Sequence, residues 1–322
     1  MKKNLPLLLI LCALFLGAAL FFFFKGSHAK EDITGYVPDL STEYVVTQYA
    51  DASGAQGTFY TIENDDYFLI IDGGWAENES AVRKVIAEHG NVVDAWIISH
   101  PHRDHAGAFN AIYANPGDIV IREIYDNGFD YDFIESVGEP YDDITVMETY
   151  HALTANATNI THLSRGEVLT ICGLTFTILN AYDDTVLSNV GDEKDYQNNA
   201  SLLFRVDSAN SSMLFCSDIK YDMNDYLFAT CGGAGASGGN GASSDSVDNL
   251  LACDYVQVGH HGNWSFSEDF YDATGASVFL FDAPSEITDN PDFPASSLKA
   301  SLLAKNKTVL DFSTAPNRIT LK

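Results

Sequence analysis

The sequence predicts one α/β domain with layered β-sheets over residues 31–322, preceded by a separate N-terminal segment, residues 1–30. The first supporting observation is a series of short β-rich runs that alternate with turn residues and a few helical stretches. The second is a nearly continuous apolar run from Val92 to Ser99, which is typical of a strand buried on both faces. The third is the composition: 46% hydrophobic and 12% aromatic residues supply a core and exclude a disordered chain.

The N-terminal segment contains an uncharged apolar run from Leu5 to Phe24. A helix of that length is about 30 Å long, which is the thickness of a bilayer core. Two interpretations compete: a transmembrane signal anchor, or a signal peptide cleaved after the small residues of Ser27-His28-Ala29. The run exceeds the roughly 7 to 15 residues usual in cleaved signals, which favours the anchor. Either interpretation predicts export, as a membrane protein with an extracellular domain or as a secreted protein, because Lys2 and Lys3 should stay in the cytoplasm.

The charge of the chain is strongly negative. It has 322 residues with 17 Lys or Arg against 45 Asp or Glu, a formal net charge of −28. The first 30 residues hold four lysines and no acid, so the remainder is more acidic still. Such a surface repels polyanions, and nucleic acid is therefore not expected as a general partner.

In the first half of the domain, the sequence pattern predicts three strands, a glycine turn, a helix and the buried strand already described. Their ranges are Tyr44 to Tyr49, Gly57 to Ile62, Tyr67 to Ile71, the turn Asp72-Gly73-Gly74, and the helix Glu77 to Glu88.

In the second half, the sequence pattern predicts further strands and a last helix. A low-complexity stretch rich in glycine and serine, from Cys231 to Ser246, interrupts them. The strands are 118–125, 168–179, 200–206, 212–216, 255–258 and 277–282, and the helix is 296–305. The cysteines have no CxxC spacing, so buried thiols are favoured over a Cys231–Cys253 disulfide, which stays open as an alternative.

The most informative segment follows the buried strand and contains four potential metal ligands within six positions. If the extended geometry continues, His100 and His102 project to one side and converge on one cation. Asp104 and His105 then occupy the following turn and face a second cation. The pattern His-x-His-x-Asp-His is too specific to be a chance product of composition.

Two later strands also end in ligand-type residues. The apolar run 212–216 leads to Asp218, a candidate for the carboxylate that bridges two metals. The run 255–258 leads to Gly259-His260-His261-Gly262, where glycines permit a close approach of the backbone. Together with the first segment, these strand ends predict a dinuclear metal site.

With these segments, the chain resembles the metallo-β-lactamase superfamily, and within it the hydrolase domain of ComEC-type DNA-uptake competence proteins. The resemblance runs from about Ile70 to Asp282 and includes Asn198-Asn199-Ala200-Ser201-Leu202. It implies a four-layer αββα sandwich with a two-metal site at one sheet edge. The roles that it implies are as follows: His100 and His102 bind the first metal, Asp104, His105 and His261 the second, Asp218 bridges both, and His260 acts on the substrate or leaving group. Asp104 and His260 are the expected catalytic residues.

One departure from the family concerns the first metal. Many members supply a third histidine from the region where Asn198 and Asn199 stand here, and asparagine replaces imidazole poorly. His162 is an alternative ligand for the first metal. It is also interpreted as an ordinary polar residue near a strand.

The expected function is that of an exported metal-dependent hydrolase, a phosphodiesterase acting on a small-molecule or polymeric ester. Two divalent ions, zinc or alternatively manganese or iron, would lower the pKa of a shared water. Arg103 and Lys220 adjoin the ligands and either help to bind phosphate or are solvated charges, and Trp75, Trp264 and Tyr271 either line an apolar subsite or belong to the core. The alternatives are a nuclease acting on single-stranded DNA and a metal-binding wall protein without turnover.

Overall fold

The computed structural model describes residues 42–138, 142–190, 194–232, 249–313 and 315–322. The predicted membrane segment and nearly all of the glycine-rich stretch lie outside these ranges. No helix within them is long and apolar enough to cross a membrane.

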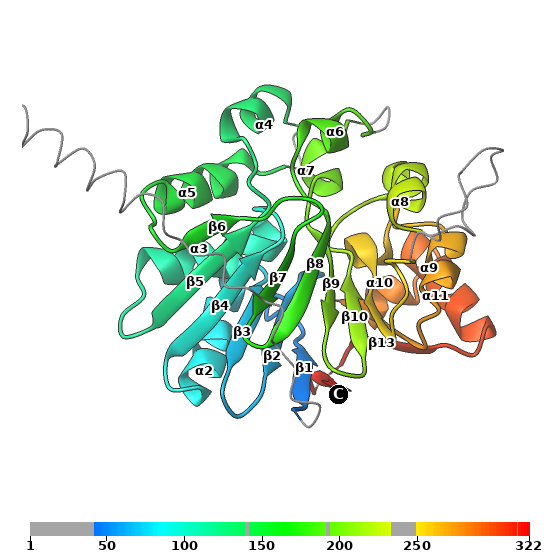
Figure 1. Ribbon diagram of the computed structural model, residues 1–322, viewed down its shortest axis with the longest axis horizontal. Helices are drawn as coiled ribbons and strands as arrows, with labels where there is room; N and C mark the ends of the chain where they lie inside the picture. The colour runs from blue at the N-terminus through cyan, green and yellow to red at the C-terminus, as the bar shows by residue number, and fades with distance from the viewer. Residues whose placement is uncertain (1–41, 139–141, 191–193, 233–248, 314) are drawn as a thin grey trace, which may run out of the picture. The chain divides into compact units, whose positions relative to one another are not determined.

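The described residues form two mixed seven-stranded sheets (Figure 1). The order of the first is β14-β1-β2-β3-β4-β5-β6, and that of the second is β13-β12-β11-β10-β9-β8-β7. The first sheet comprises β1 (Tyr44–Gln48), β2 (Phe59–Glu63), β3 (Phe68–Asp72), β4 (Val92–Ile98), β5 (Val120–Asp126), β6 (Ile160–His162) and β14 (Asn317–Leu321). The second comprises β7 (Val168–Ile171), β8 (Leu174–Asn180), β9 (Leu203–Asp207), β10 (Ser212–Phe215), β11 (Tyr255–Gln257), β12 (Val278–Pro284) and β13 (Thr308–Phe312). Strands β3 to β6 pair in parallel, as do β10 to β13, and the remaining pairs between neighbouring strands are antiparallel.

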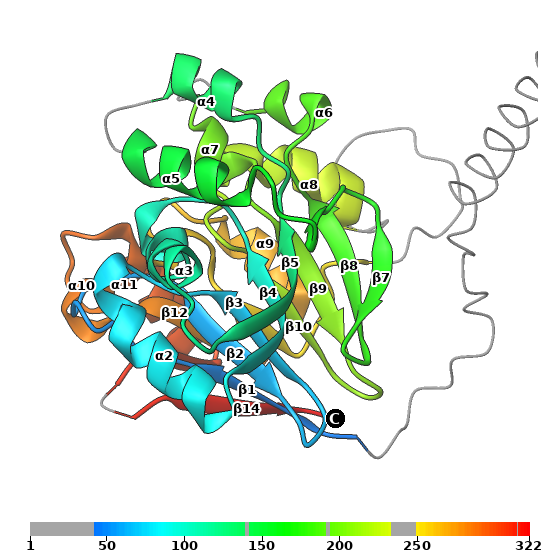
Figure 2. The ribbon, with the colours of Figure 1, turned by 90° about the vertical axis from the view of Figure 1, so that its left-hand side faces the viewer.

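Helices α2, α3 and α5 pack on the outer face of the first sheet and α8, α9 and α11 on that of the second, while α4, α6 and α7 lie above the strand ends in Figure 1 (Figures 1 and 2). The bounds of the helices are α2 (Glu79–Glu88), α3 (Arg103–Ala114), α4 (Tyr131–Val137), α5 (Ile144–Thr154), α6 (Asp184–Leu187), α7 (Tyr196–Asn199), α8 (Asn224–Cys231), α9 (Glu268–Thr274), α10 (Ser285–Thr288) and α11 (Pro294–Ala304).

Strand β4 illustrates why the layers form. Ala95 and Ile97 face the core between the two sheets, whereas Trp96 and Ile98 pack in the core beneath α2 and α3. Because side chains alternate between the two faces of a strand, a strand covered on both sides must be apolar at nearly every position. The prediction of an α/β fold with layered sheets is thus confirmed.

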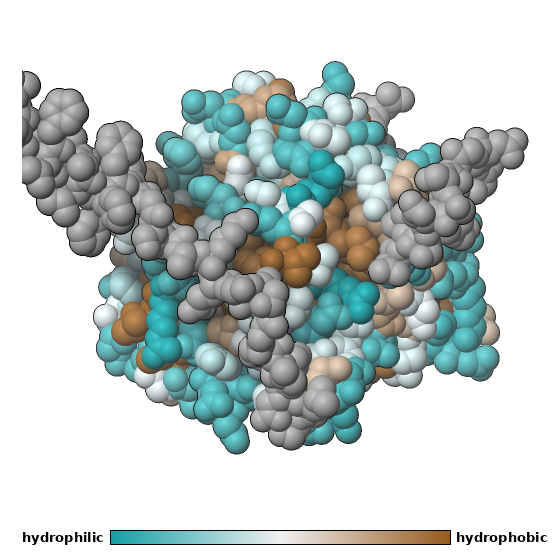
Figure 3. Space-filling model, viewed as in Figure 1, coloured by the Kyte–Doolittle hydropathy of each residue, from teal (hydrophilic) through white to brown (hydrophobic). Residues whose placement is uncertain are grey.

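The face of the molecule seen in Figure 3 is hydrophilic around its rim, and hydrophobic residues gather across its middle.

Several expected elements differ in detail. The expected strand over 168–179 is a hairpin of β7 and β8, because Cys172 and Gly173 have positive φ angles of 50° and 81° that turn the chain. The expected turn after the first histidines is the start of α3. A disulfide between Cys231 and Cys253 is absent, since all four described cysteines are free.

Candidate metal centre

The predicted ligands meet where parallel strands of the two sheets end. His100 and His102 follow β4, Asp218 follows β10, and His261 follows β11. Asp104 and His105 lie in the first turn of α3, not in an irregular turn as expected, but the helix carries both side chains toward the same place. The carboxyl ends of parallel strands are a common location for ligand sites in α/β proteins.

Asp218 lies at the centre of this cluster. Its Oδ1 is 3.1 Å from His105 Nε2, and its Oδ2 is 3.3 Å from His261 Nε2 and 4.0 Å from His100 Nε2. Two groups of ligand atoms share this residue: Asp104, His105, Asp218 and His261 form one, and His100, His102 and Asp218 the other, each with its ligand atoms within 4.8 Å of one another. The arrangement offers two adjacent cation positions with one common carboxylate.

The outward nitrogen of each imidazole is held by a hydrogen bond. His105 Nδ1 donates to Asp72 Oδ2 at 2.8 Å, and His102 Nε2 donates to Asp142 Oδ1 at 3.0 Å. His261 Nδ1 donates to the backbone oxygen of Asp282 at 3.1 Å.

The fourth imidazole, that of His100, is held through Ser99. Because the Ser99 hydroxyl gives its single proton to Asp72 at 2.8 Å, it accepts from His100 Nδ1 at 3.1 Å. In all four rings the inward nitrogen is therefore unprotonated in the neutral form, which is the tautomer that binds a metal.

The inward atoms fit cations because they lack other partners. His105 Nε2, His261 Nε2 and Asp218 Oδ1 are buried without a hydrogen-bond partner among the described residues. His100 Nε2 and His102 Nδ1 lie 3.0 Å apart. Because the proton of each neutral ring is on the other nitrogen, these two atoms are both acceptors and cannot bond each other. Such atoms are costly to bury unless a shared positive charge satisfies them.

The electrostatics of the centre follow from the same proximity. Although burial disfavours the ionised form of Asp218, His105 and His261 outweigh burial and hold its pKa well below the usual range. Burial also disfavours charge on His261, but Asp218 and Asp104 raise its pKa to about 10. The pKa of His100 is lowered well below its ordinary value, by burial first and then by His105 and His102.

The backbone beneath the centre adopts conformations that L-residues avoid. Asp72, Ser217, His260 and His261 have φ angles of 55°, 47°, 48° and 56°, and exposed Trp264 has 47°. Each such residue costs on the order of 1–3 kcal/mol, and strain of this kind concentrates at functional sites.

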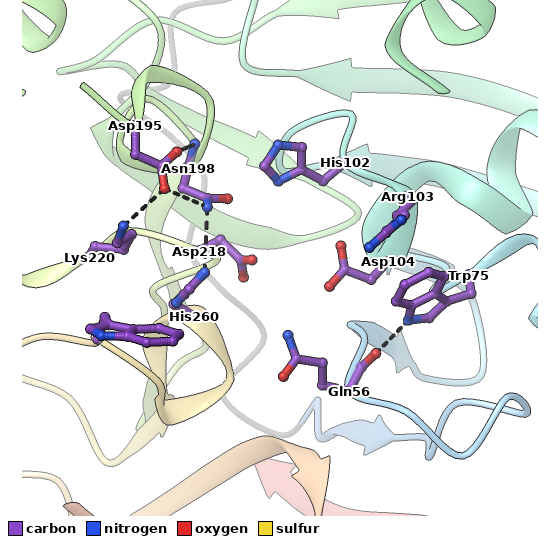
Figure 4. Close-up of a pocket in the computed structure, with 11 residues that line it drawn as sticks. Gln56, Trp75, His102, Arg103, Asp104, Asp195, Asn198, Asp218, Lys220 and His260 are labelled. Atoms are coloured by element: carbon purple, nitrogen blue, oxygen red, sulfur yellow. Dashed lines mark hydrogen bonds and ion pairs between the residues drawn. The ribbon is translucent and has the colours of Figure 1, made fainter. Parts of the chain in front are cut away.

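A cleft of about 410 Å³ opens onto the metal centre (Figure 4). Lys220 lines it and is only 6% exposed, with its Nζ 3.1 Å from Asp195 Oδ2, so the interpretation as a solvated charge is wrong for this residue. Arg103 also lines the cleft, and its guanidinium lies 4.7 Å from the ring centre of Trp75. The cleft therefore presents two cationic side chains beside a centre rich in carboxylates.

Other predicted residues fall into three groups. His260 and Trp264 line the cleft. Tyr271 is 1% exposed, and its hydroxyl accepts from the Gly259 amide, so it belongs to the core. His162 lies on β6, where its Nδ1 is 2.6 Å from Asp126 Oδ1 in a pair outside both ligand groups.

Sequence reasoning missed three carboxylates around the centre. Asp142 holds His102 from a position 40 residues along the chain, and Asp195 lies in the cleft wall. Asp282 is fully buried and accepts hydrogen bonds from Gln48 and Tyr60 of the first sheet, which ties the two sheets together below His261. None of them lies in a short motif: Asp142 lies two residues before α5, Asp195 directly precedes α7, and Asp282 lies within β12.

The comparisons with known proteins concern the family and the fold. Residues 52–162 match the family model described as the metallo-beta-lactamase superfamily. No curated protein matches the chain.

Similar solved structures include the metallo-beta-lactamase fold protein YhfI from Bacillus subtilis, at 14% identity and a TM-score of 0.50, covering 87% of this chain and 99% of that one. They also include a variant of the beta-hydroxylase CmlA, at 12% identity and a TM-score of 0.50, covering 86% of this chain and 54% of that one. At these identities the likeness concerns the fold alone.

Proposed function

We propose that this protein is a dinuclear-metal-dependent phosphodiesterase. The observation that carries the proposal is Asp218, which belongs to both ligand groups: its Oδ1 is 3.1 Å from His105 Nε2 and its Oδ2 is 4.0 Å from His100 Nε2. A carboxylate shared between two cation positions is the arrangement that two-metal hydrolases use to attack phosphoesters. Members of the superfamily are metal-dependent hydrolases, whereas the phosphoester preference is our inference.

The ligands for each cation follow from the two groups. His100 and His102 would hold the first ion, Asp104, His105 and His261 the second, and Asp218 both. Imidazole and carboxylate suit zinc, and they also accept manganese or iron. When bound, the ions supply Lewis acidity and lower the pKa of a water molecule.

Two cationic side chains favour an anionic substrate. Lys220 is held by Asp195 in the cleft wall, and Arg103 is held over Trp75 on another part of the cleft. An ammonium and a guanidinium both bind phosphate oxygens. They provide local attraction for a phosphoester in a chain whose overall charge is −28.

His260 is the candidate for proton transfer. Its Nδ1 donates to the backbone oxygen of Asn263 at 2.5 Å, so its Nε2 is the atom that exchanges a proton with a group in the cleft. We infer that Nε2 serves the leaving oxygen. Asp104 Oδ2 lies 3.3 Å from His261 Nε2, which supports a role in metal binding. Asp104 also lines the cleft, so we infer that it orients a water molecule there.

The cellular setting is part of the proposal. Residues 1–30 favour export, so we propose a substrate at the cell surface or outside it, a small molecule or a polymer. The likeness to competence-type hydrolases rests on the sequence segments alone, and the acidic charge argues against extending it to DNA.

The test uses the purified full-length chain with bis-p-nitrophenyl phosphate. We expect hydrolysis that is lost with a chelator, returns with divalent metal, and is lost in His102→Ala. His151→Ala is the matched control, because this histidine is exposed on α5, where its ring stacks on Tyr131. Full activity after complete metal removal would overturn the proposal, and one metal per chain without activity on esters would favour a metal-binding protein without turnover.

A further inference from the structure

Asn198 contributes an amide to the wall of the cleft. It lies in the short helix α7 and is 4% exposed, yet it lines the cleft beside the metal centre. The resemblance predicts a histidine ligand in this region, and an amide at this position has a different chemistry. Its orientation decides which atom it offers.

The neighbours of Asn198 fix that orientation. Its Nδ2 lies 3.0 Å from Asp195 Oδ2 and 3.4 Å from His260 Nε2, so both amide hydrogens have acceptors. An ionised carboxylate only accepts hydrogen bonds, and His260 Nε2 is an acceptor because Nδ1 donates to Asn263. Flipping the amide would place its oxygen against the carboxylate of Asp195, which has no proton to donate, and this excludes the alternative assignment.

Asp195 is itself held in place. Its Oδ2 lies 3.1 Å from Lys220 Nζ, and its Oδ1 accepts from the backbone amide of Asn198 at 3.2 Å. Asp195 is 3% exposed, so burial and these contacts restrict its movement. The wall of the cleft is therefore a preorganised unit of three side chains.

The remaining atom of the amide, Oδ1, is buried and has no hydrogen-bond partner among the described residues. Figure 4 shows it turned away from Asp195, toward the open space between His102 and Asp104. A buried acceptor without a partner is unfavourable unless a ligand supplies a donor.

We propose that Asn198 Oδ1 accepts a hydrogen bond from a hydroxyl group of the substrate, so that the preferred substrates are phosphoesters of a polyol or sugar with a free hydroxyl near the scissile bond. This inference rests on the proposed phosphodiesterase function. A neutral hydroxyl fits better than an ammonium donor, because Lys220 and the cations that the metal centre would hold repel positive charge at this wall. A site built to bind a hydroxyl discriminates strongly against the analogue that lacks it.

The experiment compares two substrates that share the p-nitrophenolate leaving group. They are 3-hydroxypropyl p-nitrophenyl phosphate and propyl p-nitrophenyl phosphate, tested with the metal-loaded full-length chain, and product analysis excludes release of p-nitrophenolate through a cyclic phosphate. We expect kcat/KM to favour the hydroxylated ester by about tenfold or more. In Asn198→Ala the ratio should fall to about one, because no acceptor remains.

Two further variants separate recognition from structure. Asn198→Ser keeps a small donor near Asp195 but loses the amide oxygen, and it should lose the preference as well. Asn189→Ala is the control, because the exposed side chain of that asparagine bonds its near neighbours Thr185 and Ser188 outside the cleft, and it should keep the wild-type ratio.

The outcomes distinguish this inference from the proposed function. Equal kcat/KM values for the two phosphodiesters in the wild type would overturn the role of Asn198 and leave the phosphodiesterase standing. Loss of a metal ion from Asn198→Ala would identify Oδ1 as a metal ligand, and it would also overturn the proposed contact between Asn198 and a substrate hydroxyl.

A second pair, p-nitrophenyl 3-hydroxybutyrate and p-nitrophenyl butyrate, tests the ester class. Hydrolysis of this pair alone, with the hydroxyl preference, would overturn the phosphoester function and keep the role of Asn198. Turnover of neither pair by the metal-loaded protein would overturn both.

Discussion

Replacing Asp72 by asparagine should weaken the second metal position without removing any ligand. Asp72 is fully buried, its Oδ2 accepts from His105 Nδ1 at 2.8 Å, and its Oδ1 accepts from the backbone amide of Ser99 at 2.8 Å. An amide has only one oxygen, so in either orientation its NH₂ group faces one of these donors. If it faces His105, the ring proton moves to Nε2, the atom that points at Asp218.

The expected loss is that of a hydrogen bond that orients a metal ligand. Such changes weaken metal binding about 10- to 100-fold, or about 1.4–2.7 kcal/mol. Competition with a chromogenic chelator measures the two stepwise zinc affinities, and Asp72→Asn should lower the one that depends on His105.

Asp142→Asn is the matched variant for the other position. Asp142 holds His102 Nε2 at 3.0 Å, so this change should weaken the metal bound by His100 and His102 instead. Activity at saturating metal should recover in both variants. Wild-type affinities at both positions in Asp72→Asn, or an identical defect in the two variants, would refute this account of how the imidazoles are oriented.

Three further predictions follow from the packing, the pKa shifts and the charge. In Gly107→Ala the new Cβ would lie 2.5 Å from the backbone nitrogen of Ala76, so we expect a loss of about 1–3 kcal/mol in the free energy of unfolding, measured by chemical denaturation. Gly73→Ala, whose nearest contact would be 3.4 Å, should be tolerated, and equal stabilities would refute the prediction. The apparent metal affinity should rise between pH 6.5 and 8.5, because His261, with its pKa raised to about 10 by Asp218 and Asp104 against burial, must release its proton before it binds metal. Calorimetry in buffers of different ionisation enthalpy would detect the released protons. A metal affinity that does not change with pH would contradict the predicted rise. Single-stranded DNA should persist with the metal-loaded protein at low salt, whereas rapid degradation on a gel would favour the nuclease alternative.

The parts of the fold that could be predicted are those with strong local patterns. The run from Val92 to Ser99 indicates a strand covered on both faces, and β4 is buried between the inter-sheet core and the helices. The histidine segment that follows it indicates a metal site because several ligand types occur at short spacing, and the structure gathers those side chains around Asp218. Their catalytic and metal-binding roles stay predictions.

The parts that could not be predicted depend on contacts between distant segments. Helix α3 begins inside the histidine segment, where His102, Asp104 and His105 suggest an irregular turn. Strand β14 pairs with β1 across most of the chain, and no local pattern encodes that partner.

The site shows the same limitation. Asp142 holds His102 only because the fold places the start of α5 beside the metal centre, and the burial of Lys220 depends on Asp195. An aspartate directly before a helix, such as Asp195 before α7, indicates a helix cap, so the contact of Asp195 with Lys220 appears only in three dimensions.

The most direct test of the central claim is the metal content of the purified full-length chain, measured by elemental analysis alongside hydrolysis of bis-p-nitrophenyl phosphate. We predict two divalent ions per chain, with activity that returns in proportion as metal is added back to the chelated protein. In Asp218→Ala, which removes the shared carboxylate, both positions should lose affinity. A wild-type protein that is fully active with no bound metal, or an Asp218→Ala variant that keeps both ions at wild-type affinity, would contradict the account.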